Sequence, residues 1–114
     1  MDDCLFCKIA AGEIPSSKVY EDEDVLAFRD IAPQAPVHVL VIPKKHVSGW
    51  YDAKGESDAA LAKLMRTAAK VAELEGIVES GFRVVSNCGK DAKQSVSHLH
   101  MHVLGGREMS GEMA

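Results

Sequence analysis

Three of the five histidines stand at alternate positions within Gln94–Leu104, as His98, His100 and His102. Successive side chains of a β-strand point to opposite faces of a sheet. If this segment is a strand, the three imidazole rings form one row with a spacing of about 7 Å. The opposite face of that strand then carries three apolar side chains, Leu99, Met101 and Val103. One face of the expected strand therefore carries the chemically reactive imidazoles, and the other face belongs to the hydrophobic core.

Neighbouring imidazoles at this spacing disfavour one another's protonation, so the row is expected to be mostly neutral at pH 7. Neutral imidazole serves as a nucleophile, a general base or a metal ligand. Two mechanisms are therefore open: the row chelates a catalytic metal, or the middle histidine attacks an electrophile while its neighbours bind the developing charge. Nearby neutral donors suit phosphate oxygens and favour the second mechanism; they are Asn87, Gln94, Ser95 and Ser97.

The composition limits what this histidine row can belong to. With 114 residues, 46% hydrophobic and 26% charged, the chain suits a single globular domain spanning 1–114. No apolar run is long enough to cross a bilayer, so no membrane partner is expected. Met1–Asp3 is acidic where a signal peptide needs a basic segment, which predicts a cytoplasmic protein. The net charge of −4 argues against a nucleic-acid polymer as partner and leaves room for a focused nucleotide site.

The three cysteines are an odd number and do not form a disulfide framework. Cys4 and Cys7 are spaced as a metal-binding or redox pair. A thioredoxin-like role would need a strand before the motif, and there is no room for one before Cys4. Cys88 is expected to be a passive loop residue.

Hydrophobic periodicity and turn residues predict five strands and two helices. A short helix is expected from Cys4 to Gly12, and a long helix from about Ser57, which caps it, to Gly76. Residues 48–55 show no periodicity and are expected to be irregular. The expected strands are Lys18–Tyr20 and Asp24–Arg29, which form a hairpin, then Val37–Pro43, Phe82–Asn87 and Gln94–Leu104.

Two of these elements have a clear apolar pattern. Val37–Pro43 is apolar on both faces and is expected to lie in the centre of the sheet. The long helix has one apolar face that is expected to be core, formed by Leu61, Leu64, Met65, Ala68, Val71, Ala72 and Leu74 or Glu75. Strands joined mostly by turns, with one long helix between the third and fourth, predict an antiparallel α+β fold of sheet on helix.

Three blocks of the sequence resemble the histidine-triad superfamily. Gln94–Arg107, which reads Gln-Ser-Val-Ser-His-Leu-His-Met-His-Val-Leu-Gly-Gly-Arg, resembles its signature. Asp30–His46 resembles a second block, and the segments Cys4–Ile9 and Gly12–Pro15 resemble a third, so the similarity covers almost the whole chain. The Leu-Gly-Gly-Arg ending and the Gln-Ala-Pro block look more like the histidine-triad nucleotide-binding proteins, which are purine nucleoside phosphoramidases, than like the dinucleoside polyphosphate hydrolases.

The resemblance implies a five-stranded antiparallel sheet with one long helix and a short N-terminal helix, and it implies catalytic roles. By this resemblance, His100 attacks the α-phosphorus of a purine nucleotide and forms a nucleotidyl-histidine intermediate that water resolves. The attacking Nε2 must be unprotonated, so a hydrogen bond from Nδ1 of His100 to a backbone carbonyl is expected. His102, Ser95 and Asn87 resemble the residues that contact the phosphate and the leaving group.

Further positions resemble the nucleotide site of the superfamily. Asp30 resembles a ribose-binding carboxylate, and Gln94 adds a neutral donor. His38 resembles the fourth histidine of the site, with a buried structural histidine as the alternative. The purine base would lie between apolar side chains that are also plausible core residues, namely Leu5, Phe6, Ile9, Phe28 and Ile31. The nearby cations Arg29 and Lys93 are expected to point to solvent.

Some members of the superfamily bind structural zinc through the cysteine pair and two histidines. The matching residues are Cys4, Cys7, His46 and His98. Such a Cys₂His₂ site would be tetrahedral, with sulfur at about 2.3 Å and nitrogen at about 2.1 Å from the metal. A reduced and metal-free pair is the alternative. No organic cofactor is expected.

The leading functional hypothesis is a hydrolase that cleaves the bond at the α-phosphate of purine nucleoside phosphoramidates, with a nucleoside monophosphate or phosphoramidate as ligand. Two alternatives stay open: a dinucleoside polyphosphate hydrolase, and a nucleotide- or zinc-binding interaction module with incidental turnover. The tail, residues 107–114, lacks the tryptophan found there in the best-known eukaryotic relatives, which leaves the leaving-group preference open. The resemblance also implies a homodimer that joins two sheets into one of ten strands.

Overall fold

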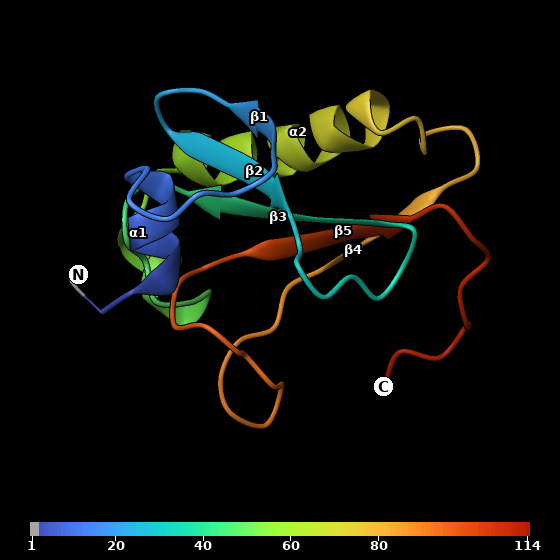
Figure 1. Ribbon diagram of the computed structural model, residues 1–114. Coiled ribbons are helices and arrows are strands. Elements are labelled where there is room, and N and C mark those ends of the chain that lie inside the picture. Colours follow the sequence, from blue (N-terminus) through green and yellow to red (C-terminus); the bar gives the residue numbers. More distant parts are fainter. Residues whose placement is uncertain (1–2) are drawn as a thin grey trace.

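A computed structural model of the chain describes residues 3–114. Five strands form one antiparallel sheet in the order β1-β2-β3-β5-β4 (Figure 1). The strands are β1 (Lys18–Glu21), β2 (Val25–Arg29), β3 (Val37–Pro43), β4 (Phe82–Val85) and β5 (Met101–Gly105). The helices are α1 (Leu5–Ala10) and α2 (Asp58–Leu74), with a short 3₁₀ helix at Tyr51–Gly55 where an irregular segment is expected. The predicted antiparallel α+β fold is confirmed.

The prediction of a cytoplasmic location rests on the acidic segment Met1–Asp3 at the N-terminus. Two of these positions, Met1 and Asp2, lie outside the described residues. Within residues 3–114, no helix has the length and apolar character needed to cross a membrane.

Both helices start at capping side chains. The hydroxyl of Ser57 accepts the backbone N–H of Ala60 at 3.1 Å, which satisfies a free donor in the first turn of α2. In α1 the cap is Cys4, whose sulfur accepts the backbone N–H of Cys7 at 3.4 Å. This cap places both cysteine side chains together at the N-terminal end of α1.

The central strand β3 contributes side chains to two separate hydrophobic cores. Its alternate residues Val39 and Val41 pack against α2, in a cluster that also contains Leu64 and Val71. The other face of β3 contributes Leu40 and Ile42 to a smaller cluster under α1, with Phe6, Ile9, Leu26 and Phe28. Figure 1 shows the long α2 running along the sheet and the short α1 at one end of it. His38 lies on the α1 face of β3. Because only the short α1 packs on this face, it has room for a site.

Part of the apolar stripe on α2 lies outside the core, contrary to the sequence prediction. Leu64, Ala68, Val71 and Ala72 are buried as predicted, whereas Met65 is 70% exposed and Leu74 is 51% exposed. Met65 faces the edge strand β4 across a shallow groove lined also by Phe82 and Val84. Within residues 3–114 the sheet ends at β4, so no further strand of the described chain covers this side of the helix.

β5 is shorter than the predicted strand Gln94–Leu104. It starts at Met101, and the segment from Gln94 to His100 is irregular. The carboxamide of Gln94 donates to the backbone carbonyls of Ser48 at 2.7 Å and Val96 at 3.0 Å, which ties this segment into a loop. The apolar face predicted for this stretch is nevertheless confirmed, because Leu99, Met101 and Val103 are all buried on the α2 side.

Candidate active site and metal cluster

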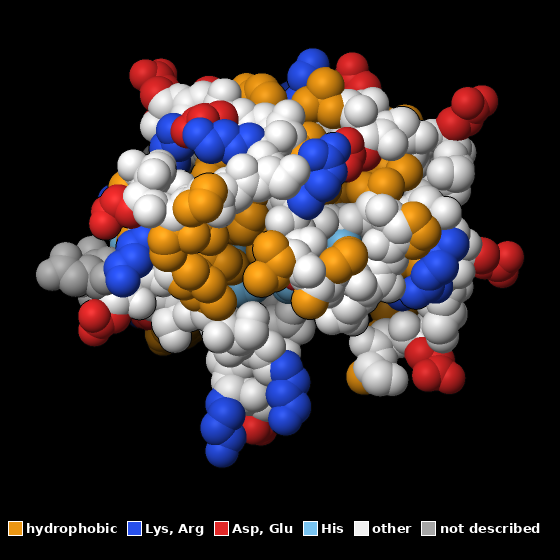
Figure 2. Space-filling model, in the orientation of Figure 1, with side chains coloured by type: hydrophobic (Ala, Val, Ile, Leu, Met, Phe, Trp, Pro, Cys, Tyr) orange, Lys and Arg blue, Asp and Glu red, His pale blue; other side chains and the backbone are white. Residues whose placement is uncertain are grey.

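A cavity of about 490 Å³ opens on the α1 face of the sheet. Its volume lies within the range of small-molecule sites. Apolar walls come from α1 and the sheet, through Phe6, Ile9, Phe28 and Leu40, and polar groups come from Asp30, Ser95, His100 and His102. The ring of Phe6 packs edge-on against Phe28 and against His100, at centroid distances of 5.6 Å and 5.0 Å. Figure 2 shows hydrophobic side chains gathered beside a hollow in which histidine surface is visible.

The tautomer of His100 follows from its backbone partner. Nδ1 of His100 lies 2.7 Å from the carbonyl oxygen of His98. A carbonyl only accepts hydrogen bonds, so in the neutral ring the proton sits on Nδ1 and Nε2 keeps its lone pair. The hydrogen bond predicted from the sequence is therefore present. The ring is 2% exposed and lines the cavity.

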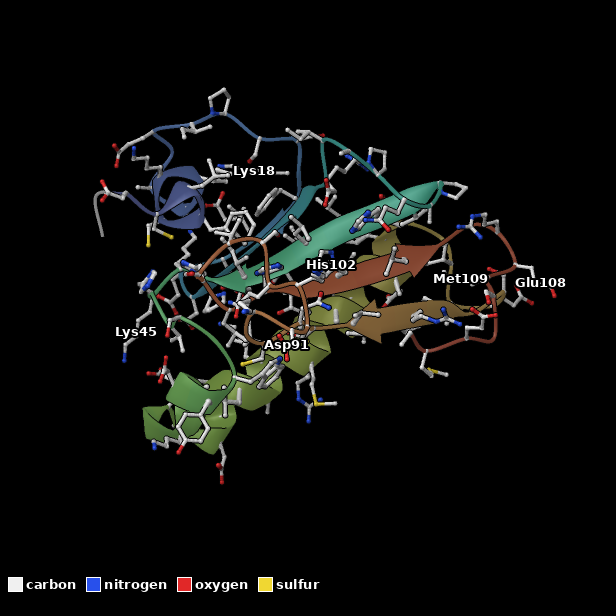
Figure 3. The ribbon with its side chains drawn as sticks, turned by 90° about the horizontal axis from the view of Figure 1, so that it is seen from below. Lys18, Lys45, Asp91, His102, Glu108 and Met109 are labelled. Carbon is white, nitrogen blue, oxygen red and sulfur yellow. The ribbon has the colours of Figure 1, made fainter. Side chains whose placement is uncertain are left out.

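A chain of hydrogen bonds fixes His102 in the opposite tautomer. The backbone N–H of Gln34 donates to Nδ1 of His38 at 3.1 Å, so the proton of neutral His38 sits on Nε2. That nitrogen lies 2.8 Å from Nδ1 of His102, which must accept. His102 therefore carries its proton on Nε2, as a donor. Figure 3 shows His102 on β5, on the face of the sheet turned away from α2.

Burial keeps these imidazoles neutral. It lowers the pKa of His38, and the carboxylate of Asp30, 3.5 Å from Nε2 of His38, only partly offsets this. Burial also lowers the pKa of His98. For His102 burial is the largest cause and the charges of His100 and His38 add to it, so that its pKa falls to about 4. His38, His98 and His102 are thus neutral at pH 7, which the sequence predicts for His98 and His102.

The first histidine does not share the row with the other two. The rings of His100 and His102 lie 5.1 Å apart, closer than the spacing of a regular strand face. His98 instead points to the N-terminal end of α1, where its Nδ1 lies 3.3 Å from Sγ of Cys4. Its Nε2 donates to the carbonyl of Pro43 at 2.8 Å, which leaves Nδ1 with a free lone pair. The row of three that a strand over Gln94–Leu104 would give is therefore absent, and His98 lies with the cysteine pair, as the expected zinc site requires.

Four side chains predicted as zinc ligands meet at this point. The donor atoms of Cys4, Cys7, His46 and His98 all lie within 4.8 Å of one another. Sγ of Cys7 is 3.2 Å from Nδ1 of His46 and 3.5 Å from Nδ1 of His98. In a tetrahedral site with the usual bond lengths, sulfur and nitrogen ligands are about 3.6 Å apart. The cluster has the donors and very nearly the spacing that zinc requires.

The remaining predicted residues fall in different places. Asp30 lines the cavity, where its Oδ1 accepts the N–H of Ala32 at 2.8 Å. Ser95 also lines it, whereas Asn87 lies at a neighbouring cavity and its amide donates to the carbonyl of Ala92 at 2.8 Å. Gln94 lines neither cavity, because its amide is bound to backbone groups.

Two of the expected apolar walls lie at the rim of the cavity. Phe6, Ile9 and Phe28 are buried, while Leu5 is 44% exposed and Ile31 is 101% exposed. Both rim residues still line the cavity. Their exposure fits an open mouth through which a ligand would enter.

Sequence reasoning missed several residues near the site. Ser16 lines the cavity and its buried hydroxyl has no hydrogen-bond partner within residues 3–114. Arg83 lines the neighbouring cavity, because β4 pairs with β5 so that Arg83 lies opposite Leu104 and shares the sheet face of His102. A strand register worked out from the sequence could have found Arg83. No sequence signal marks Ser16.

Comparisons with known proteins agree with this geometry. The HIT domain model matches residues 11–109. The chain is 45% identical over 113 residues to a purine nucleoside phosphoramidase of Escherichia coli K12, covering 99% of this chain and 95% of the relative. It is 50% identical over 110 residues to a 14 kDa zinc-binding protein of Brassica juncea, covering 95% and 96%. A solved HIT family hydrolase from Legionella pneumophila matches with a TM-score of 0.92 and 50% identity, covering 96% and 97%.

The similarities and the arrangement of the histidines define the class of the protein, which is a hydrolase of the histidine-triad type. The chain belongs to the HIT domain family, in its branch of histidine-triad nucleotide-binding proteins. The resemblance drawn from the sequence blocks is thereby confirmed.

Lowering the pH is expected to destabilise the fold through His102. Its pKa is about 4 in the folded protein against an ordinary 6.5, so the unfolded chain binds this proton more readily. The contribution of His102 to the free energy of unfolding is complete above pH 6.5 and is lost as the pH falls from 6.5 to about 4. Urea unfolding at several pH values measures it, and a His102→Gln variant should lack this part. The same pH dependence in both proteins would contradict the assignment.

Proposed function

We propose that the protein hydrolyses purine nucleoside phosphoramidates at the bond between the α-phosphorus and nitrogen. The observation that carries this proposal is the free Nε2 of His100, held beside a nucleotide-sized cavity by the hydrogen bond from Nδ1 to the carbonyl of His98. The name of the 45% identical relative, a purine nucleoside phosphoramidase, supports the same substrate class. The single-domain organisation and the cytoplasmic location expected from the sequence are part of this proposal.

In the proposed complex the purine base lies against the apolar walls at Phe6 and Phe28. The carboxylate of Asp30, whose side chain is 21% exposed, accepts hydrogen bonds from the ribose hydroxyls. The buried hydroxyl of Ser16, without a partner within residues 3–114, donates to the nucleoside. The α-phosphate then lies between His100, His102 and Ser95, at the polar end of the cavity.

The proposed reaction has two displacements at phosphorus. In the first, the lone pair on Nε2 of His100 forms a bond to phosphorus, the P–N bond breaks, and the amine leaves with the bonding pair and takes a proton from solvent. In the second, water attacks phosphorus, the bond to His100 breaks, and the proton of the water goes to solvent. The products are a nucleoside monophosphate and an amine.

The surrounding groups stabilise the charges that develop during this reaction. The ring of His100 becomes cationic as Nε2 bonds to phosphorus, and the carbonyl of His98 already faces its Nδ1–H. That hydrogen bond is therefore stronger in the transition state than in the resting enzyme. The Nε2–H of His102 and the hydroxyl of Ser95 donate to phosphate oxygens, in the way of an oxyanion site.

Replacing the nucleophile should abolish the intermediate. A His100→Ala variant is expected to lose about 10⁴-fold or more in kcat on adenosine phosphoramidate, because water cannot replace the aligned imidazole. Mass spectrometry of wild-type protein denatured during turnover should show an adduct of nucleoside monophosphate mass, and the variant should show none. Cys88→Ser, at an exposed thiol, is the control that keeps the adduct. Turnover without any adduct in the wild type would contradict a covalent mechanism.

The two alternative functions predict different outcomes of related measurements. A dinucleoside polyphosphate hydrolase with the same nucleophile would form the adduct but react faster with a diadenosine polyphosphate than with adenosine phosphoramidate. An interaction module would bind the nucleotide without forming the adduct, and any turnover would be incidental.

We also propose that Cys4, Cys7, His46 and His98 hold one structural zinc ion. The four donor atoms are already gathered, and Nδ1 of His98 has its lone pair directed at the cysteines. The name of the Brassica juncea relative, a zinc-binding protein, supports the metal. Bound zinc would link α1 to the loop after β3 and to the segment before β5. His98, whose carbonyl accepts the hydrogen bond from Nδ1 of His100, would thereby be fixed at both its ring and its backbone.

Zinc analysis of purified protein under non-chelating conditions should find about one ion per chain. A Cys4→Ser variant should lose most of the metal and melt at a lower temperature, because a tetrahedral site with three ligands is weak. Cys88→Ser should keep both. Far less than one zinc per wild-type chain would refute the site.

We propose further that two chains pair through β4 and α2, to form one sheet of ten strands. The outer edge of β4 has no partner strand within residues 3–114. Large apolar side chains are exposed beside it, with Phe82 at 39%, Val84 at 43% and Met65 at 70%. A second copy would satisfy the backbone groups of the edge and cover this patch.

Light scattering should give the mass of a dimer for the wild type and of a monomer for Val84→Arg, which places a charge in the centre of the proposed interface. Val78→Arg, at a residue that is 55% exposed and belongs to neither α2 nor β4, is the matched control and should stay dimeric. A monomeric wild type at micromolar concentration would exclude the proposed dimer.

A further inference from the structure

A second cavity, of about 540 Å³, adjoins the proposed nucleotide site. His102 and Ser95 line both cavities, so the two spaces meet at the polar groups that would hold the phosphate. If the nucleoside fills the first cavity, the group leaving from phosphorus points into the second. The inference below therefore rests on the proposed function and concerns the chemistry of the leaving group.

The second cavity is lined by three cations that come from separate parts of the chain. Arg83 belongs to β4, Lys93 to the loop between β4 and β5, and Arg107 to the segment after β5. No Asp or Glu lines the cavity. Asp91 lies on the loop that carries Lys93, and Glu108 lies on the segment that carries Arg107 (Figure 3). Both acidic residues are exposed and line neither cavity. The leaving-group side is therefore positively charged, although the net charge of the chain is −4.

The two arginines are held in place at the wall of this cavity. A guanidinium nitrogen of Arg83 donates to the carbonyl of Ser110 at 2.7 Å, and one of Arg107 donates to the carbonyl of Gln34 at 3.1 Å. A guanidinium has five N–H groups, so each arginine keeps donors for a ligand. None of the ion pairs within residues 3–114 involves either arginine, and their charge is not neutralised by a carboxylate.

Lys93 has an unusual backbone conformation. Its φ of 63° is the only positive value at a non-glycine residue within residues 3–114. This left-handed conformation is strained for a residue with a Cβ, and glycine adopts it freely. Such strain at a cavity wall points to function. The sequence prediction of a solvent-directed Lys93 is correct in that the residue is exposed, but it also lines the cavity.

We propose that this cavity recognises an anionic group on the leaving group, and that the preferred substrates are nucleotides whose leaving group carries a carboxylate or a phosphate. An amino acid joined to the nucleotide through its α-amine supplies a carboxylate, and a polyphosphate chain supplies phosphate. The anion binds to Lys93, Arg83 and Arg107 and takes no part in bond making or breaking. Its attraction to the cations aligns the leaving group with the bond that breaks.

A matched pair of substrates tests this recognition. Adenosine 5′-phosphoramidates of L-alanine and of L-alaninamide have the same size and differ in one negative charge. At low ionic strength, kcat/KM for the alanine compound should exceed that for the alaninamide compound by about tenfold, and the ratio should shrink at about 0.5 M salt. A Lys93→Gly variant should lower the ratio at least about threefold, while Lys90→Gln, on the same loop but outside the cavity, should keep it.

Stability gives an independent measure of the role of Lys93. If the lysine is retained for binding at the expense of strain, Lys93→Gly should raise the melting temperature by a few degrees while it lowers the substrate ratio. A parallel series with diadenosine polyphosphates identifies the anion. If the charge-dependent increase in kcat/KM is larger for the polyphosphates than for the alanine compound, the preferred anion is phosphate. If it is smaller, the preferred anion is carboxylate.

The outcomes separate this inference from the proposed function. Equal rates for the two alanine compounds in the wild type, or a ratio that Lys93→Gly leaves unchanged, would overturn the anion site and leave the phosphoramidase intact. Hydrolysis of neither compound would overturn the phosphoramidase, and the anion site with it.

Discussion

The hydrogen bond from Nδ1 of His100 to the carbonyl of His98, at 2.7 Å, decides what the histidine cluster can do. It places the proton of the neutral ring on Nδ1 and leaves a lone pair on Nε2 beside the cavity. The acceptor belongs to a residue whose own ring is anchored on the carbonyl of Pro43 at 2.8 Å. The ring of His100 is thus oriented by backbone groups, which do not titrate and hold their position as long as the fold does.

The division of the sheet into two faces makes this arrangement stable. One face is fully used by α2, which buries β3 and the apolar side of the segment 99–103. The other face receives only the short α1, so space is left for a cavity and for buried but hydrogen-bonded imidazoles. Buried histidines are tolerated here because each ring has at least one hydrogen-bond partner. Burial also lowers the pKa of His38, His98 and His102, so these three rings stay neutral. The cluster of Cys4, Cys7, His46 and His98 then ties the end of α1 to the loops that carry the site.

Much of the fold was predictable from the sequence, because its elements depend on local patterns. The alternation in Val37–Pro43 and the capping residue Ser57 give β3 and α2 directly. Met65 was assigned wrongly to the core, because an apolar helix position is the same in sequence whether it faces its own sheet or open space beside an edge strand. The extent of β5 was overestimated, because the side chain of Gln94 binds backbone groups that lie 46 residues away in the chain, and no local pattern shows such a contact.

The site shows the same distinction. The resemblance to the histidine-triad superfamily was enough to predict that the four cluster residues lie together and that His100, His102 and Asp30 share one site, and the structure places these three at one cavity. The partners that set the tautomers are the N–H of Gln34 and the carbonyls of His98 and Pro43, and backbone groups carry no signal in a sequence. The sequence predicts a solvent-directed Lys93 and no cationic cavity, because Arg83, Lys93 and Arg107 come from separate segments that only the folded chain joins.

The most direct test of the account is the protonation state of each imidazole nitrogen, measured by ¹⁵N NMR at neutral pH on protein labelled in histidine. The account predicts that His100 carries its proton on Nδ1 alone and His102 on Nε2 alone. A proton on Nε2 of His100, or a His100 ring protonated on both nitrogens, would contradict the claim that the fold holds this residue ready to attack phosphorus.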